Sequence, residues 1–237
     1  EITITVGTGT PIHDIQCPDD LEEAAIGYCY ETTMVGEIVS TSGIVTHVIP
    51  LGHSNEKNFF LQQSGAETCG GIYIYDYDIN PNVGDEVTIT GTVGEWDAVT
   101  QLNNITSADV NNSVECISPL TINTGDLGIG CTIEGEYLEG MLVRVENVTV
   151  IGFDEFDNVE IDDGSGITLL DDHYFDGEWP DISIGDEFSS IAGVVSYYFD
   201  FKIYPRNAAD FNNDNDDCCP CPLGDLNCDD KWNILDI

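Results

Sequence analysis

The strongest chemical pattern in the sequence is a series of oxygen-bearing side chains near residue 230. Carboxylate and amide groups occupy positions 1, 3, 5, 9 and 12 of a twelve-residue stretch. A calcium loop presents its oxygen ligands with this spacing, and its position 7 contributes a backbone carbonyl. The alternative is a solvated acidic tail. The predicted calcium ligands are Asp225, Asn227, Asp229, Lys231 (through its carbonyl), Asn233 and Asp236.

This stretch resembles the first calcium loop of type I dockerin repeats, in which position 12 is Asp. Two departures qualify the resemblance. Asp230 stands at position 6, where calcium loops normally have glycine, although Asp tolerates a left-handed backbone better than most residues. The sequence also ends at Ile237, before the helix and second repeat of a complete dockerin. The resemblance therefore implies Ca²⁺ binding, but it does not imply binding to a cohesin.

A second acidic segment directly precedes this loop. It has the alternating Asp-x-Asn-x-Asp pattern of calcium ligands but lacks a spaced carboxylate at position 12. The alternative is again a solvated acidic face. The predicted ligands are Asp210, Asn212, Asp214 and Asp216.

The overall charge limits the possible partners. The chain of 237 residues has 45 Asp and Glu against 5 Lys and Arg, a formal net charge of −40. Nucleic acids and anionic membranes are recognised through clustered Lys and Arg, so we expect neither as a partner. So many like charges repel within a compact body. Bound Ca²⁺ or a surrounding of high salt would relieve this repulsion.

Nine cysteines favour an oxidising, extracellular location, because short-stranded intracellular proteins rarely carry so many. The spacing of Cys17 and Cys29 predicts one disulfide, and that of Cys116 and Cys131 predicts a second. The odd number leaves one cysteine for an intermolecular bond or for a partner elsewhere. The close group near the end lacks the partners of a zinc site, so disulfides are preferred there as well. These C-terminal candidates are Cys218, Cys219, Cys221 and Cys228.

Strand signals dominate the chain, and the fold class is predicted to be all-β. The segments rich in Val, Ile, Thr, Tyr and Phe are separated by Gly, Asn and Asp turns. One short helical turn is expected near 18–25. No stretch reaches the roughly 18 apolar residues of a membrane-spanning helix. The expected strands are 2–6, 38–49, 58–63, 71–77, 86–93, 142–151, 158–161, 167–170, 188–198 and 201–204.

An internal repeat predicts two consecutive small β-barrels. Residues 83–93 match residues 184–195 with one inserted residue, and 36–50 correspond loosely to 140–152. The expected domains are an N-terminal strand with a disulfide-closed extension (1–32), a first barrel (33–116), a second barrel (117–212) and an acidic, Cys-rich tail (213–237).

Both barrels resemble the OB-fold domains that accompany the catalytic domain in secreted bacterial nucleases, and that also occur in other extracellular proteins. The resemblance covers about residues 10 to 212 and implies OB-fold-like barrels. It does not fix a function, because one fold hosts many. It rests on residues 39–48, 59–62, 71–75, 83–85, 90–93 and 100–102 in the first barrel, and on 139–143, 162–166, 185–186 and 204–207 in the second.

Residues for catalysis or for nucleic-acid binding are not brought together by any motif. The histidines are scattered outside the usual metal and triad patterns, so we expect no enzymatic activity. An OB barrel binds strands through stacking aromatics and a basic groove. The first barrel offers Lys57 alone as a cation. Core packing, or for the tyrosines a place at strand edges, is the expected role of the aromatic candidates Tyr73, Tyr75, Tyr77, Trp96, Tyr197, Tyr198 and Phe199. The four scattered histidines are His13, His47, His53 and His173.

We therefore expect a non-enzymatic, secreted, calcium-binding structural protein that forms a homo-oligomer or filament. Segment 2–6 would add to a neighbour's sheet edge, or would pair within its own barrel, and the unpaired cysteine would lock the contact. Two alternatives stay open. The chain is an accessory region of an extracellular nuclease, or it is a calcium-dependent glycan-binding module. In none of these cases do we expect membrane insertion.

Overall fold

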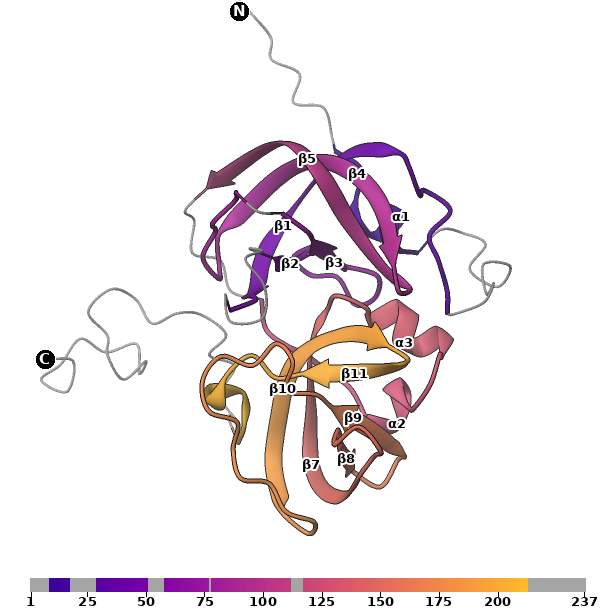
Figure 1. The fold of residues 1–237 in the computed structure, drawn as a ribbon, viewed down its shortest axis with the longest axis vertical. Coiled ribbons are helices and arrows are strands. Elements are labelled where there is room, and N and C mark those ends of the chain that lie inside the picture. The colour runs from indigo at the N-terminus through magenta and orange to yellow at the C-terminus, as the bar shows by residue number, and fades with distance from the viewer. Residues whose placement is uncertain (1–8, 18–28, 51–57, 77, 112–116, 213–237) are drawn as a thin grey trace, which may run out of the picture.

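The computed structural model describes residues 9–17, 29–50, 58–76, 78–111 and 117–212. Within these residues the chain is mainly β-structure and forms two closed β-barrels in tandem (Figure 1). The predicted all-β, two-barrel fold is therefore confirmed. The strand expected at 2–6, the helical turn expected near 18–25 and the tail 213–237 lie outside the described residues.

The first barrel has five strands in the order β1-β2-β3-β5-β4 and is closed by pairing of β4 with β1. Strand β1 pairs with two strands: residues 38–44 pair with β4, and residues 44–48 pair with β2. The helix α1 packs beside it. The elements are α1 (Ile12–Gln16), β1 (Ile38–Val48), β2 (Phe59–Gln62), β3 (Gly71–Ile74), β4 (Glu86–Trp96) and β5 (Val99–Asn111).

The second barrel repeats this arrangement. Its order is β7-β8-β9-β11-β10, it is closed by pairing of β10 with β7, and the short β6 adds to β7 in parallel. The elements are β6 (Leu120–Thr121), α2 (Thr124–Leu127), α3 (Ile133–Leu138), β7 (Leu142–Phe153), β8 (Val159–Asp162), β9 (Ile167–Leu170), β10 (Glu187–Tyr198), β11 (Asp200–Tyr204) and a 3-10 helix η2 (Ala208–Asp210).

The internal repeat is visible in one turn of each barrel. Gly84 has φ 90° and Gly185 has φ 94°, a region of backbone space that glycine enters at little cost. The following Asp accepts a hydrogen bond from the amide three residues earlier, at 2.7 Å for Asp85 and 2.8 Å for Asp186. The Gly-Asp pairs therefore start β4 and β10 in the same way, as the sequence match indicated.

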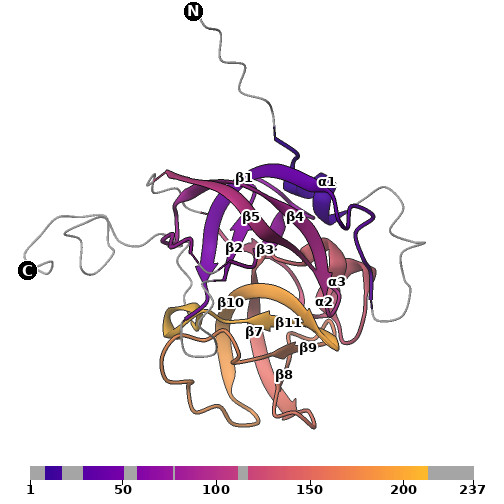
Figure 2. The ribbon, with the colours of Figure 1, turned by 45° about the horizontal axis from the view of Figure 1, so that its top comes forward.

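The two barrels lie against each other in both views (Figure 1, Figure 2). At the joint the backbones of Gly71 and Gly140 approach so closely that a Cβ on either would overlap the other's main chain. The Gln62 side chain accepts a hydrogen bond from the Leu142 amide at 2.8 Å. A shared apolar cluster reinforces these contacts, formed by Ile49, Phe60, Leu142 and Val194 with Tyr73 and Tyr174 packed against them. The barrels are thus joined by backbone contacts and a common core.

Two disulfides lie within the described residues, and they correct both predicted pairs. Cys17 bonds to Cys69, not to Cys29, and Cys29 bonds to Cys131, not Cys116. Short spacing suggested local loops. Instead α1 packs beside the start of β3, which brings Cys17 to Cys69, and Cys29 reaches the start of α3. The bonds bridge separations of 52 and 102 residues. Cys116 and the C-terminal cysteines lie outside the described residues.

Candidate functional site

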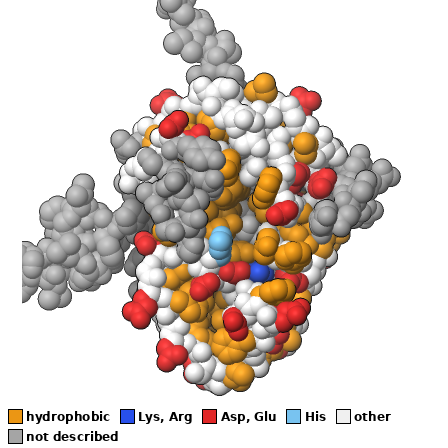
Figure 3. All heavy atoms as spheres, in the orientation of Figure 1, with side chains coloured by type: hydrophobic (Ala, Val, Ile, Leu, Met, Phe, Trp, Pro, Cys, Tyr) orange, Lys and Arg blue, Asp and Glu red, His pale blue; other side chains and the backbone are white. Residues whose placement is uncertain are grey.

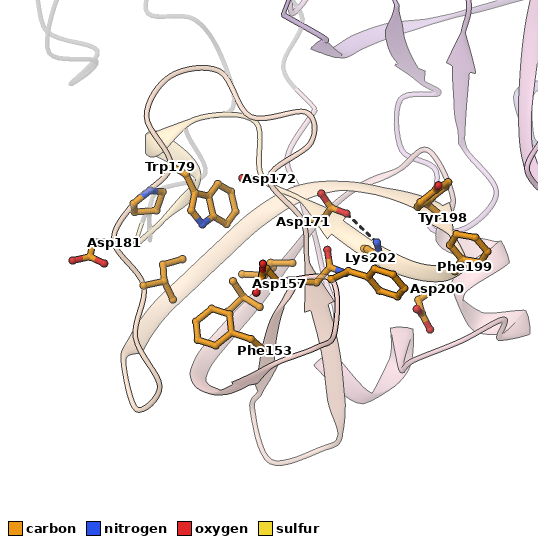
Figure 4. A pocket seen from close by; sticks show the side chains of 16 residues that line it. Phe153, Asp157, Asp171, Asp172, Trp179, Asp181, Tyr198, Phe199, Asp200 and Lys202 are labelled. Atoms are coloured by element: carbon orange, nitrogen blue, oxygen red, sulfur yellow. Dashed lines mark hydrogen bonds and ion pairs between the residues drawn. The ribbon is translucent and has the colours of Figure 1, made fainter. Parts of the chain in front are cut away.

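A hollow at one end of the second barrel has a volume of about 700 Å³. Its walls come from the turn between β7 and β8, the loop between β9 and β10, and the turn between β10 and β11. In Figure 4, Trp179 and Asp181 stand on one side and Tyr198 and Phe199 on the other, with Lys202 and Asp171 between them. Three loops of a rigid barrel thus converge on one concave surface.

Aromatic rings form much of this lining, and several of them are exposed. Phe156 is 66% exposed, Tyr198 53% and Phe199 64%. Trp179 is held from behind by edge contacts with Phe175 and Phe211. Exposed rings grouped around a hollow are typical of a binding surface and are unusual elsewhere on a protein.

Phe199 also has an unusual backbone conformation. Its φ is 62°, in the left-handed region that a bulky side chain enters at a cost of about 1–2 kcal/mol. Glycine or asparagine would fit the turn between β10 and β11 with less strain. The ring packs edge-on against Tyr198 and otherwise faces solvent. The strained backbone of Phe199 is not offset by burial of its ring. This points to a role for the exposed ring.

The charges around this hollow are negative, with one internal exception. Among the described residues that line it, Lys202 is the only Lys or Arg, and this side chain is buried. Its Nζ lies 2.9 Å from Asp171 Oδ2 and 5.6 Å from the centre of the Tyr198 ring. The cation is therefore neutralised by its own neighbours. The remaining lining carboxylates are Asp157, Asp172, Asp181 and Asp200.

The hollow continues from the second barrel onto the first. A middle hollow of about 430 Å³ shares Asp171 and Tyr198 with it, and also includes Trp96, which is 70% exposed. A third hollow of about 730 Å³ on the first barrel shares Tyr73, Trp96 and Gln101 with the middle one. We call the three together the aromatic groove. Figure 3 shows hydrophobic side chains running down this face from one barrel to the other, with carboxylates beside them and very little Lys or Arg.

A separate cluster of carboxyl groups, two of them buried and one half-buried, lies where the two barrels meet. Glu95 on β4, Glu136 on α3 and Glu139 just after α3 gather around the amide of Gln16, the last residue of α1. Gln16 Nε2 and the Thr100 backbone amide donate to Glu139 Oε2 at 2.6 and 3.0 Å. We call these residues the carboxyl cluster. The oxygens that accept no well-formed hydrogen bond are Gln16 Oε1, Glu95 Oε2, Glu139 Oε1 and both of Glu136.

This environment favours the neutral acids. Burial raises the pKa of Glu95 to about 7, against hydrogen bonds from Thr100 and Thr32 that favour its ionised form. Burial, followed by the neighbouring carboxylates, also raises the pKa of Glu136 and of Glu139 well above the usual range. Protonated carboxyl groups supply the hydrogen-bond donors that the cluster otherwise lacks.

The described residues of the predicted second calcium site are engaged in other contacts. The Asp210 carboxylate accepts three hydrogen bonds from Arg206, at 2.6 to 2.9 Å, and Asn212 Oδ1 accepts one from the Ser189 amide at 2.9 Å. Asp214, Asp216 and the whole loop 225–236 lie outside the described residues, so calcium binding stays a prediction. Among the residues described, no three His, Cys, Asp or Glu side chains are placed to hold one metal ion.

His47 is a structural residue. Its Nε2 lies 3.0 Å from the Tyr174 carbonyl oxygen. Burial and the nearby Arg206 charge lower its pKa to about 4, so the ring is neutral near pH 7 and its N–H donates to that carbonyl.

The predicted aromatic candidates divide into two groups. Tyr197 is buried, as expected for a core residue, whereas Trp96, Tyr198 and Phe199 are exposed at hairpin turns. Phe156 and Trp179 were not recognised from the sequence. Their available signal was an aromatic residue within an acidic turn segment.

No family model matches the chain, and neither a curated protein nor a solved structure matches it. Within the described residues, no helix is both long and apolar enough to cross a membrane. The function must therefore be argued from the groove itself.

Proposed function

We propose that the chain is a non-catalytic, extracellular module that binds a neutral, hydroxyl-rich glycan in the second-barrel part of the aromatic groove. The observation that carries this proposal is the group of exposed rings around an acid-rimmed hollow whose only cation is already paired. The two disulfides support an extracellular location.

The chemistry of the hollow suits a sugar better than a nucleic acid. Aromatic faces offer apolar contact area, and carboxylates accept hydrogen bonds from hydroxyl groups. Phosphates would meet Asp157, Asp172 and Asp200 without a free cation to offset them. Two of the three loops, β7–β8 and β10–β11, correspond to the loops with which OB-fold barrels bind oligosaccharides or oligonucleotides, so the charge of the lining decides between these ligands. These contrasts favour a glycan-binding role over the accessory role in a nuclease.

The expected homo-oligomer or filament remains a separate prediction, because segment 2–6 and the tail 213–237 lie outside the described residues. Both barrels are closed in their described strands. Strand addition would therefore depend on those outer segments or on the partly unpaired first half of β1, where the Thr10 amide already bonds to the Ser40 carbonyl at 2.7 Å.

Affinity electrophoresis tests the proposed function. The full chain is run through gels that contain β-glucan, galactomannan or xyloglucan, and the anionic polygalacturonate serves as a comparison. We expect at least one neutral polysaccharide to retard the protein. Phe199→Ala should weaken this retardation about tenfold in apparent affinity, which corresponds to loss of about 1.4 kcal/mol.

A matched control is Tyr137→Ala, because Tyr137 is exposed on α3 and lines none of the three hollows. This variant should bind like the unmodified chain. The proposal is wrong if no neutral polysaccharide retards the protein, or if Phe199→Ala and Tyr137→Ala behave alike. Release of reducing sugars would contradict its non-catalytic part.

A further inference from the structure

We infer that the binding site extends across both barrels and takes one extended, unbranched neutral glycan chain along the aromatic groove. This inference rests on the proposed function and adds the length of the ligand and the part played by the first barrel.

The three hollows adjoin one another. The second-barrel hollow and the middle hollow share Asp171 and Tyr198, and the middle and first-barrel hollows share Tyr73, Trp96 and Gln101. A chain that leaves the second-barrel hollow beside Tyr198 therefore enters the hollow that Trp96 lines. The band in Figure 3 follows the same course from barrel to barrel.

The two barrels present an exposed aromatic ring at the same place. Trp96 ends β4 just before the turn to β5, and Tyr198 ends β10 just before the turn to β11, so the two rings occupy equivalent places in the repeated barrels. In the first barrel this turn consists of Asp97 and Ala98, with φ 49° and 62°, which makes a tight hairpin. A ligand made of repeating units matches a surface that presents the same element twice.

The hydrogen-bonding groups of the first-barrel hollow distinguish a glycan from a basic peptide as the ligand. Gln101, Asn103 and Asn104 line the first-barrel hollow together with Asp76. An amide side chain both donates and accepts, as a sugar hydroxyl does, whereas Lys and Arg side chains only donate. A site for basic peptides would need acceptors alone. The amide row on β5 therefore favours a polyhydroxylated chain.

The joint between the barrels fixes the groove before any ligand arrives. The close approach of Gly71 to Gly140 and the bond between Gln62 and the Leu142 amide leave little room for one barrel to move against the other. A preformed groove does not spend binding free energy on ordering itself. Longer chains should therefore gain affinity in proportion to the contacts they add.

Calorimetric titration with oligosaccharides of increasing length tests this inference. The probes are the cello-, manno- and xylo-oligosaccharide series from disaccharide to octasaccharide, with full-length Trp96→Ala, Tyr198→Ala and Tyr137→Ala as variants. We expect the affinity of the unmodified chain to rise with length. Trp96→Ala should leave the shortest binding oligosaccharide unaffected and weaken the longest about thirtyfold, equivalent to about 2 kcal/mol.

Tyr198→Ala should weaken short and long ligands alike, because Tyr198 lines the second-barrel hollow where binding begins. The inference is overturned if affinity stops rising at the shortest binding length, or if Trp96→Ala affects short and long chains equally. It is also overturned if polylysine displaces the oligosaccharides from the groove. Absence of binding by every oligosaccharide and polysaccharide would instead reject the proposed function, so the two failures are distinguishable.

Discussion

The carboxyl cluster predicts that Glu95→Gln stabilises the protein at neutral and alkaline pH but not in acid. Glu95 Oε1 accepts hydrogen bonds from the Thr32 amide and the Thr100 hydroxyl, at 2.9 and 2.6 Å, and Oε2 accepts none. Glutamine keeps the accepting oxygen and places an NH₂ donor among the unpartnered oxygens. Burial raises the pKa of Glu95 from 4.5 to about 7. At about 1.4 kcal/mol for each pH unit, this difference corresponds to about 3 kcal/mol.

The sign follows from proton binding. Folded protein holds the Glu95 proton more tightly than unfolded protein, so the stabilising contribution is complete below about pH 4.5 and is lost as the pH rises through about 7. Glu31, Glu136 and Glu139 face the same region and add to this tendency. The unmodified chain should therefore lose stability over this range, whereas Glu95→Gln should lose about 3 kcal/mol less.

Urea unfolding at a series of pH values measures this difference directly. Effects of groups remote from the cluster cancel when the variant is compared with the unmodified chain at each pH, whereas removal of the Glu95 charge also lowers the pKa of Glu136 and Glu139. Glu134→Gln is the control, because Glu134 is exposed on the same side of the joint and lies outside the cluster. Parallel curves for Glu95→Gln and the unmodified chain would refute the reasoning. Recovery of alkaline stability by millimolar Ca²⁺ would also refute it, since a cation would then take the place that we assign to protons.

Three further predictions concern the turns, the disulfides and the joint. Phe199→Asn should relieve the left-handed backbone strain, raise the free energy of unfolding by about 1 kcal/mol and weaken glycan binding. A lower free energy of unfolding would instead show that the ring stabilises the fold by packing. Replacing Cys29 and Cys131 together by serine should lower the free energy of unfolding by about 4–5 kcal/mol, because their bond closes a long loop. Peptide mapping of the oxidised protein should recover these two residues in one disulfide-linked fragment. Arg206→Met should lower the free energy of unfolding by about 3–5 kcal/mol, because the Asp210 carboxylate stays buried without its ion-pair partner. Adding Asp210→Asn to the same chain should restore part of this stability, as measured by urea unfolding.

Most strands of the fold are predictable from the local sequence pattern. The elements that are not predictable lack a clear period in the sequence. Strand β5 was not recognised, although it pairs with β4 along most of its length, because its exposed second half alternates weakly. The helices α2 and α3 were missed because they have 4 and 6 residues, too few to show helical periodicity. The repeated Gly-Asp turn, in contrast, is a local device that the sequence shows directly.

The site was less predictable, because its residues meet only through the tertiary fold. Trp96 and Tyr198 line the same hollow, but their sequence separation of 102 residues gives no sign of this proximity. The disulfide pairs predicted from sequence spacing are wrong for the same reason. Spacing along the chain does not show that α1 packs against β3 and so brings Cys17 to Cys69. Glu95, Glu136 and Glu139 of the carboxyl cluster look like ordinary surface carboxylates in the sequence.

The bond between Cys29 and Cys131 also decides how the chain responds to tension. A pull applied outside these two residues passes directly across the bond, so the first barrel, which lies entirely between them, stays slack. The bypassed segment has a sequence separation of 102 residues, a contour length of about 340 Å at about 3.3 Å for each residue. Under oxidising conditions this length is withheld from extension, and of the two barrels only the second can lengthen. The first-barrel half of the groove is thus mechanically protected for as long as the disulfide is intact.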